Sequence, residues 1–103
     1  MIRHIVLFTL RPGIGPDDPR VVDACRAEDA LVADLGSAGA HEHYPVWAFA
    51  RDIARRPVSA DFVGVGHFDS MGALGDFLTS EAHVRAAEAW DGLVDIVVAD
   101  HEL

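Results

Sequence analysis

The sequence is poor in cysteine, in basic residues and in long apolar runs. Cys25 is the only cysteine among 103 residues, so no internal disulfide and no thiolate metal cluster can form. Eight basic residues stand against seventeen acidic ones, a net charge of −9. Only Arg55 and Arg56 are adjacent, which argues against a nucleic-acid partner. No segment is apolar for long enough to cross a bilayer, so no membrane partner is expected.

The N-terminus lacks the charged, apolar and small-residue sections of a secretory signal, which predicts a cytoplasmic protein. What the chain has is hydrophobic residues, which make up half of it and are spread throughout. A chain of this length can bury one core, so we expect a single domain over residues 1–103.

Hydrophobic periodicity predicts four strands and three helices. Apolar residues alternate on both faces of the first strand, and Asp18-Pro19, Ser70 and Ser80 each have the residue types that begin a helix. The expected strands are 2–10, 44–53, 62–69 and 93–102. The expected helices run from Pro19 to about Leu35, closed by Gly36, over a short stretch after Ser70, and from Glu81 to about Trp90.

This element order is that of the ferredoxin-like α+β sandwich with a four-stranded antiparallel sheet. Helices cover only one face of such a sheet, so the apolar residues of the other face need another cover. Face-to-face pairing of two sheets in a homodimer is the simplest one. The residues expected on this second face include Ile5, Leu7, Val63, Val65 and His67.

Two histidines lie on faces that the pattern predicts to be buried. His4 alternates with Val6 and Phe8 on the first strand, and His83 shares a helical stripe with Ala86 and Trp90. An imidazole exchanges protons near neutral pH, so two of them at one apolar pocket favour acid/base chemistry. His83 lies in the first helical turn, where the helix dipole disfavours imidazolium. The alternative is that these are capping or core histidines.

Glu28 lies at the centre of the core-facing stripe of the first helix, with Cys25 and Val32. A buried carboxylate is costly without a partner. Glu28 could orient an imidazole or hold a pKa raised towards neutral. Alternatively, the helix is rotated and Glu28 reaches solvent at the rim of the sheet.

Two glycines lie between two phenylalanines on one face of the third strand, and glycine in a strand often marks close approach of a ligand or of another backbone. If that face lies under the helices, Gly64 and Gly66 open a cavity beside His4. A bulge or close packing against a helix explains them equally well. The expected apolar walls of the cavity are Val6, Phe8, Phe77 and Trp90.

The remaining histidines give weaker signals. His41 and His43 form a His-x-His pair without an obvious third ligand, so a solvated edge is favoured over a metal site. His101 and the nearby Asp95, Asp100 and Glu102 are interpreted as polar residues at a strand end. No metal and no cofactor is expected.

The chain resembles the stress-responsive A/B barrel family, whose members are dimeric α+β barrels, over nearly its whole length. Among characterised members it looks most like olivetolic acid cyclase, an aldol-type cyclase that uses two histidines, and His4 and His83 fall on those positions. This chain has Ser80-Glu81 where the family usually has His-Pro, and Phe77 where the cyclase has a tyrosine. The segments that carry the resemblance are Ile2-Arg3-His4-Ile5-Val6-Leu7-Phe8, Phe68-Asp69-Ser70, Phe77-Leu78, Ala82-His83-Val84 and Asp100-His101-Glu102.

Together these features predict a cofactor-free enzyme acting on a small apolar or carbonyl-containing molecule, as in a polyketide-like aldol cyclisation. In this hypothesis His83 removes a proton next to a carbonyl, His4 polarises or protonates the oxygen, and Glu28 sets the charge of an imidazole. The alternatives are a non-catalytic dimeric stress-responsive or ligand-binding protein, and a cofactor-free monooxygenase.

Overall fold

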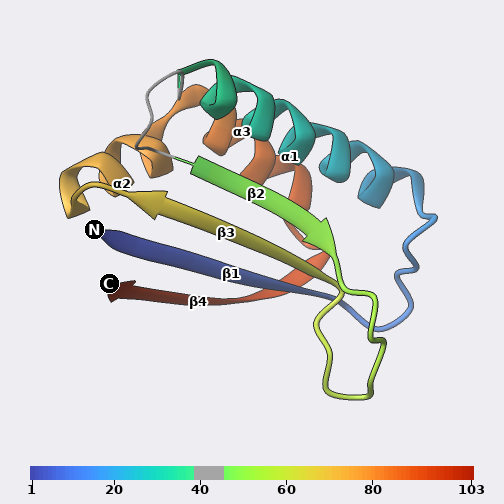
Figure 1. Ribbon diagram of the computed structural model, residues 1–103. Coiled ribbons are helices and arrows are strands. Elements are labelled where there is room, and N and C mark those ends of the chain that lie inside the picture. The colour runs from blue at the N-terminus through green and yellow to red at the C-terminus, as the bar shows by residue number, and fades with distance from the viewer. Residues whose placement is uncertain (39–45) are drawn as a thin grey trace.

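Four strands form one antiparallel sheet in the order β2-β3-β1-β4, and the helices cover one of its faces (Figure 1). The computed structural model describes residues 1–38 and 46–103. The strands are β1 (Ile2–Leu10), β2 (Val46–Arg51), β3 (Phe62–Phe68) and β4 (Val94–Glu102). The helices are α1 (Pro19–Ala38), α2 (Met71–Thr79) and α3 (Glu81–Trp90). The ferredoxin-like α+β fold is confirmed.

The helix starts follow the capping residues. Asp18 accepts hydrogen bonds from the backbone N–H and the side chain of Arg20 at the start of α1. Ser80 both ends α2 and begins α3, because its backbone N–H donates to the Phe77 carbonyl and its hydroxyl accepts from the His83 N–H. One residue therefore fixes the position of α3, and with it His83, relative to α2.

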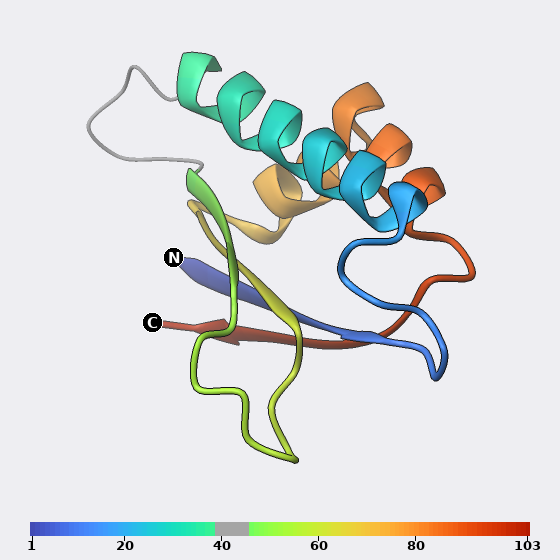
Figure 2. The ribbon, with the colours of Figure 1, turned by 90° about the vertical axis from the view of Figure 1, so that its right-hand side faces the viewer.

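Two expected element ends were wrong. Helix α1 continues through Gly36 to Ala38, because one glycine costs a helix roughly 1 kcal/mol and does not by itself end it. Strand β2 stops at Arg51, and Ile53 is 93% exposed. The Asp52 N–H donates to the Asp61 carbonyl, which closes a 52–61 hairpin that projects from the face opposite the helices (Figure 2). Tyr44 lies outside the described residues.

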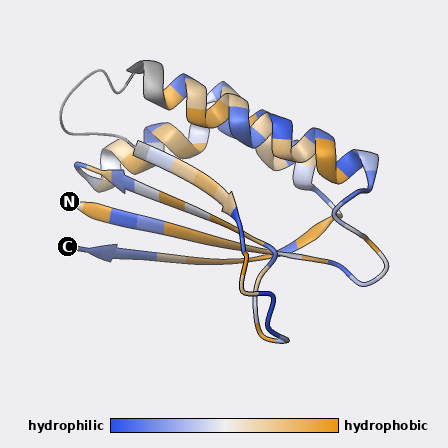
Figure 3. Ribbon diagram, turned by 45° about the vertical axis from the view of Figure 1, so that its right-hand side comes forward, coloured by the Kyte–Doolittle hydropathy of each residue, from blue (hydrophilic) through white to orange (hydrophobic). Residues whose placement is uncertain are grey.

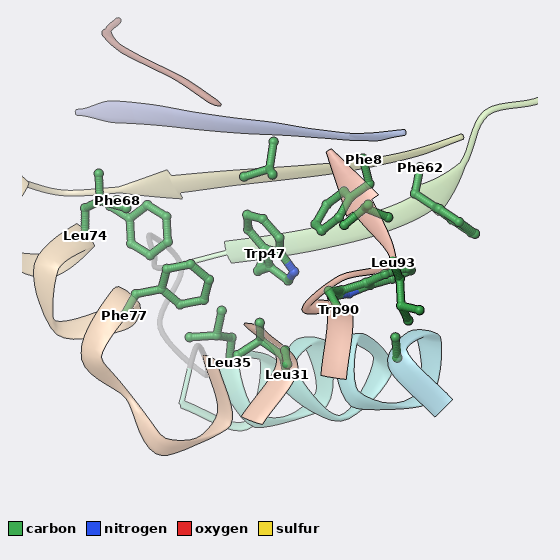
Figure 4. Close-up of a cluster of buried hydrophobic side chains, with 14 of the residues drawn as sticks. Phe8, Leu31, Leu35, Trp47, Phe62, Phe68, Leu74, Phe77, Trp90 and Leu93 are labelled. Atoms are coloured by element: carbon green, nitrogen blue, oxygen red, sulfur yellow. The ribbon is translucent and has the colours of Figure 1, made fainter. Parts of the chain in front are cut away.

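The strand register divides the sheet into two different faces. His4 of β1 lies between Gly66 of β3 and Asp100 of β4, and alternation places all three on the face under the helices. Rings from β1, β2, β3, α2 and α3 fill the space between the two layers (Figure 4). The chemistry-bearing side chains therefore project into this aromatic core.

The second face has no cover from residues 1–38 and 46–103. Leu7 and Val97 on this face are 39% and 65% exposed, and β4 is coloured as hydrophobic along its middle (Figure 3). His67 lies here as expected, and its Nε2 accepts a hydrogen bond from Arg3 Nε at 3.0 Å.

The glycine face of β3 is packed by an indole ring. A Cβ built on Gly64 would lie 2.3 Å from Trp47 Cζ2, so the ring occupies the place that a side chain would take. The expectation that Gly64 opens a cavity was wrong, and close packing explains this glycine. No described helix is long and apolar enough to cross a membrane.

Replacing Gly64 with alanine should lower the free energy of unfolding by about 1–3 kcal/mol, because Trp47 has to move away from the new methyl group. Gly75→Ala is the matched control, because Gly75 lies inside α2 with nothing within 4 Å of its built Cβ. Urea unfolding should show Gly75→Ala unchanged or more stable by roughly 0.5–1 kcal/mol. Equal stability of the two variants would contradict the packing of Trp47 on Gly64.

Candidate functional site

A cavity of about 220 Å³ lies between the sheet and the two C-terminal helices. It contains all three groups expected to carry chemistry, namely His4, Glu28 and His83. The remaining lining side chains are apolar or aromatic: Val6, Phe8, Trp47, Leu78, Ala87, Trp90, Ile96 and Val98. The cavity is thus an apolar pocket with a few converging polar groups, which is typical of small-molecule sites.

His4 is held by a carboxylate at one ring nitrogen and is unpartnered at the other. Its side chain is only 3% exposed, and Nδ1 contacts Asp100 Oδ1. An ionised carboxylate can only accept, so Nδ1 carries the proton. Nε2 is buried and has no hydrogen-bond partner among the described residues. It is therefore the polar atom of His4 whose hydrogen-bonding capacity is left unused by the described residues.

Asp100 is the main residue that sequence reasoning missed. It was interpreted as a polar residue at a strand end, whereas the register of β1 and β4 places it directly opposite His4. The available signal was alternation, because Ile96, Val98 and Asp100 share one face of the last strand. Alternation alone could not show which residue of β1 faces Asp100.

His83 enters the cavity from the first turn of α3. Burial lowers the pKa of His83, repulsion from His4 lowers this pKa further, and a hydrogen bond to the Leu78 carbonyl opposes both effects. The ring of Phe77 touches both imidazoles, with centroids 4.9 Å from His83 and 6.1 Å from His4. His83 is therefore held as neutral imidazole close to His4.

Glu28 reaches the cavity from the middle of α1 and is bound by two indoles. Trp47 Nε1 donates to Oε2 at 3.2 Å, and Trp90 Nε1 donates to Oε1 at 3.1 Å. Figure 4 shows these two rings coming from β2 and α3 into the space between the sheet and the helices. The side chain is 4% exposed, so the rotated-helix alternative was wrong.

Burial raises the pKa of Glu28, while the two indole hydrogen bonds pull this pKa back down. Among the described residues the hydrogen bonds of the Glu28 carboxyl go to Trp47 and Trp90, and the carboxylate that contacts His4 comes from β4 instead. The structure therefore assigns the orienting contact to Asp100. It leaves Glu28 as a buried carboxyl at another part of the wall.

The expected apolar walls are found only in part. Val6, Phe8 and Trp90 line the cavity, whereas Gly64, Gly66 and Phe77 do not. Phe77 contacts both imidazoles and also packs against Trp47, with ring centroids 5.2 Å apart. The lining residues that the sequence did not predict are Trp47, Leu78, Ala87, Ile96 and Val98.

No group of three or more potential metal-ligating side chains is gathered within residues 1–38 and 46–103. His41 and His43 lie outside these ranges. The described site is therefore one of two imidazoles and two carboxyls in an aromatic setting. Such a set can move a proton between two points of a bound molecule.

Raising the pH should destabilise the protein through Glu28. Its pKa is higher in the folded than in the unfolded state, so stability falls as pH rises from the unfolded value, near 4.5, through the folded one. Glu28→Gln should remove this fall, about 1.4 kcal/mol for each unit by which the pKa is raised. Urea unfolding from pH 4 to 8 measures it. Glu88→Gln, at an exposed site on α3, should keep the wild-type slope, and a parallel curve for Glu28→Gln would contradict the prediction.

Comparison with known proteins finds a relative in sequence and several solved structures with the same fold. The chain is 36% identical over 102 residues to an uncharacterized protein of Streptomyces coelicolor, covering 99% of each. A dimeric ferredoxin-like protein of unknown function from Thermobifida fusca superposes with a TM-score of 0.76 at 23% identity, covering 99% of this chain and 90% of that one. A hydroxynitrile lyase from Passiflora edulis superposes with a TM-score of 0.70 at 15% identity, covering 99% and 92%.

The model of one family matches nearly the whole sequence. It spans residues 2–103 and describes the stress responsive A/B barrel domain. The match includes β1 with His4, the α2–α3 segment with His83, and β4 with Asp100. The chain therefore belongs to the stress responsive A/B barrel family.

Proposed function

We propose that the protein is an enzyme that uses His4 and His83 for acid/base chemistry at the carbonyl group of a small, uncharged molecule. One observation carries the proposal above all. A buried imidazole with an unpartnered nitrogen lines a cavity that also contains a second, neutral imidazole. Two titratable groups with different environments in one apolar pocket are the usual means of assigning one acid and one base.

His83 is the base in this proposal. Its lowered pKa keeps the ring neutral near pH 7, so a lone pair is available to take a proton from the carbon next to a carbonyl. The ring N–H bonded to the Leu78 carbonyl fixes the orientation of the imidazole. Ser80 fixes the turn from which His83 projects.

His4 is the acid, and Asp100 positions it. In the reactive form that this proposal requires, a proton on Nε2 of His4 passes to the carbonyl oxygen as His83 takes the carbon-bound proton, so the substrate becomes an enol without change of total charge. Asp100 contacts Nδ1 and thereby orients the His4 ring for this transfer. In an aldol step the enol carbon then attacks a second carbonyl, the enol O–H proton returns to His4, and the proton held by His83 passes to the new alkoxide oxygen.

The lining indicates the substrate class. It contains no arginine, and the chain contains no lysine at all, which excludes a Schiff-base aldol mechanism through a lysine amine. The carboxyls of Glu28 and Asp100 lie at or beside the cavity and disfavour an anionic ligand. The volume of about 220 Å³ is below the roughly 300–1,000 Å³ of drug-sized sites. A small neutral ketone or diketone satisfies these limits.

The particular reaction that we favour is an aldol-type cyclisation of a polyketide-like chain. The resemblance to olivetolic acid cyclase at His4 and His83 supports it, and the hydroxynitrile lyase of Passiflora shows that a protein of this fold can be an enzyme on small molecules. Phe77 packs behind the imidazoles and cannot supply the phenol of the cyclase. In this proposal His4 therefore holds the carbonyl oxygen of the substrate without help from a phenol at position 77.

We further propose that the protein is a homodimer. The uncovered sheet face, with half-exposed or exposed Ile5, Leu7, Val63, Val65 and Val97, supports this assembly, as does the dimeric relative of Thermobifida fusca. Burial of apolar surface is the main favourable contribution to such association.

Exchange of carbon-bound hydrogen for deuterium tests the chemistry without knowledge of the natural substrate. The wild-type protein should accelerate exchange next to the carbonyl of acetophenone or 1-phenylbutane-1,3-dione in D₂O, followed by proton NMR. His83→Gln should lower the rate about 10²–10⁴-fold, because a positioned base contributes that much. The rate should rise with pH through the lowered pKa of His83.

Matched variants separate chemistry from folding in this experiment. Asp100→Asn should lower kcat with little change in KM, whereas Asp95→Asn, also exposed on β4, should leave both unchanged. His101→Gln should exchange at the wild-type rate. Exchange that persists at the wild-type rate in both His4→Gln and His83→Gln would disprove the proposed roles, and oxygen uptake during turnover would favour a monooxygenase instead.

Charge discrimination gives a second test. Acetophenone should bind and exchange, while 4-acetylbenzoate, which adds a carboxylate to the same ketone, should bind at least about tenfold more weakly because the lining offers it no cation. Titration by NMR measures both affinities. Equal affinities would show that the pocket does not select against anions.

A further inference from the structure

Glu28 is a buried carboxyl at the cavity to which the proposed reaction assigns no step. Its side chain is 4% exposed and lines the cavity, and within residues 1–38 and 46–103 each of its oxygens accepts one indole N–H. An ionised carboxylate can accept about four hydrogen bonds in all, so the indoles use about half of this capacity. Burial limits the access of water to the rest, and a donor on a bound molecule can replace that water.

The two indoles connect Glu28 to different parts of the lining. Trp47 donates to Oε2 and packs against the His4 ring, with centroids 5.6 Å apart. Trp90 donates to Oε1 and packs against Phe8, with centroids 5.2 Å apart. His4 and Phe8 lie on the same face of β1, and four residues of a strand span about 13 Å. The lining therefore extends well beyond the imidazoles, and Glu28 is the acceptor in the part that they do not reach.

The chemistry of the wall indicates which donor fits. A cationic donor has to leave water for a largely apolar lining, which is costly, whereas a neutral hydroxyl loses much less. A hydroxyl also matches either form of Glu28, because it donates to a carboxylate and accepts from a protonated carboxyl. A neutral molecule that carries a hydroxyl group is therefore the better match.

We infer that Glu28 is a specificity-determining residue that binds a hydroxyl group of the substrate while the reacting carbonyl lies at His4 and His83. The substrate class is then a hydroxyketone whose two oxygens lie at opposite ends of an apolar body. The inference rests on the proposed function for the place of the carbonyl. Binding of the hydroxyl can be measured without turnover.

Two ketones of nearly equal shape test the inference. 4-(Hydroxymethyl)acetophenone and 4-ethylacetophenone differ only in a terminal hydroxyl or methyl group opposite the carbonyl. An apolar pocket without a partner for the hydroxyl prefers the ethyl compound, because the hydroxyl loses its hydrogen bonds to water. We expect the reverse, with the hydroxyl compound at least about tenfold tighter, since a hydrogen bond to a charged group contributes about that much. Isothermal titration calorimetry measures both dissociation constants.

The ratio of the two dissociation constants within each variant locates the partner of the hydroxyl. Glu28→Gln should lower the preference for the hydroxyl compound at least about threefold, because hydrogen bonds to neutral groups are roughly half as strong as those to charged ones. His4→Gln should keep the wild-type ratio, since His4 lies at the carbonyl end. Glu88→Gln, at an exposed site of α3, is the matched control and should also keep it.

A measurement on the wild type makes the test independent of how well a variant folds. The chain has two tryptophans, so its NMR spectrum contains two indole N–H signals. Both indoles donate to Glu28, so the methylene protons beside the bound hydroxyl should give nuclear Overhauser effects to these N–H protons. The acetyl protons of the same ligand should not.

Three results would overturn the inference. They are an ethyl compound that binds as tightly as the hydroxyl compound, an unchanged ratio in folded Glu28→Gln, and a bound hydroxymethyl group near the imidazoles instead of the indoles. A preference for the hydroxyl without hydrogen exchange next to the carbonyl would contradict the acid/base proposal alone. Exchange of both ketones with equal affinity would contradict the role of Glu28 alone.

Discussion

The buried carboxyl of Glu28 is the constraint on which the rest of the site depends. It projects from α1 and accepts one indole N–H from β2 and one from α3. Removing a carboxyl from water is unfavourable unless hydrogen bonds replace the lost ones. These two bonds therefore fix Trp47 and Trp90, and each ring supports a different aromatic cluster: His4, Phe68 and Phe77 on one side, and Phe8, Phe49 and Phe62 on the other.

Each polar group of the cavity has at least one interaction partner within the protein. His4 has Asp100 at Nδ1, His83 has the Leu78 carbonyl, and Glu28 has an indole at each oxygen. Such contacts fix ring orientation and tautomer before a ligand arrives. Few polar atoms remain for a ligand, and among the described residues the buried Nε2 of His4 has no partner. A site with so few free polar atoms selects by shape and by charge.

Local patterns predicted the layers of the fold and the inward faces of three site residues. Strand alternation placed His4, and helical spacing placed His83 and Glu28, since these periods depend only on neighbours in the sequence. Contacts between distant strands were not predictable in this way. The register that brings Asp100 to His4, and the ring that packs on Gly64, depend on strand pairing that no local pattern encodes.

Both tryptophans of the chain hydrogen-bond to the same carboxyl and line the same cavity. The tryptophan emission of the protein therefore arises wholly from the walls of its pocket. An occupant that displaces water from the indoles, or a proton that neutralises the carboxylate beside them, changes the electric field at both chromophores. The molecule thus contains its own optical reporter, and unlabelled protein is sufficient for screening compound collections by a shift in emission wavelength.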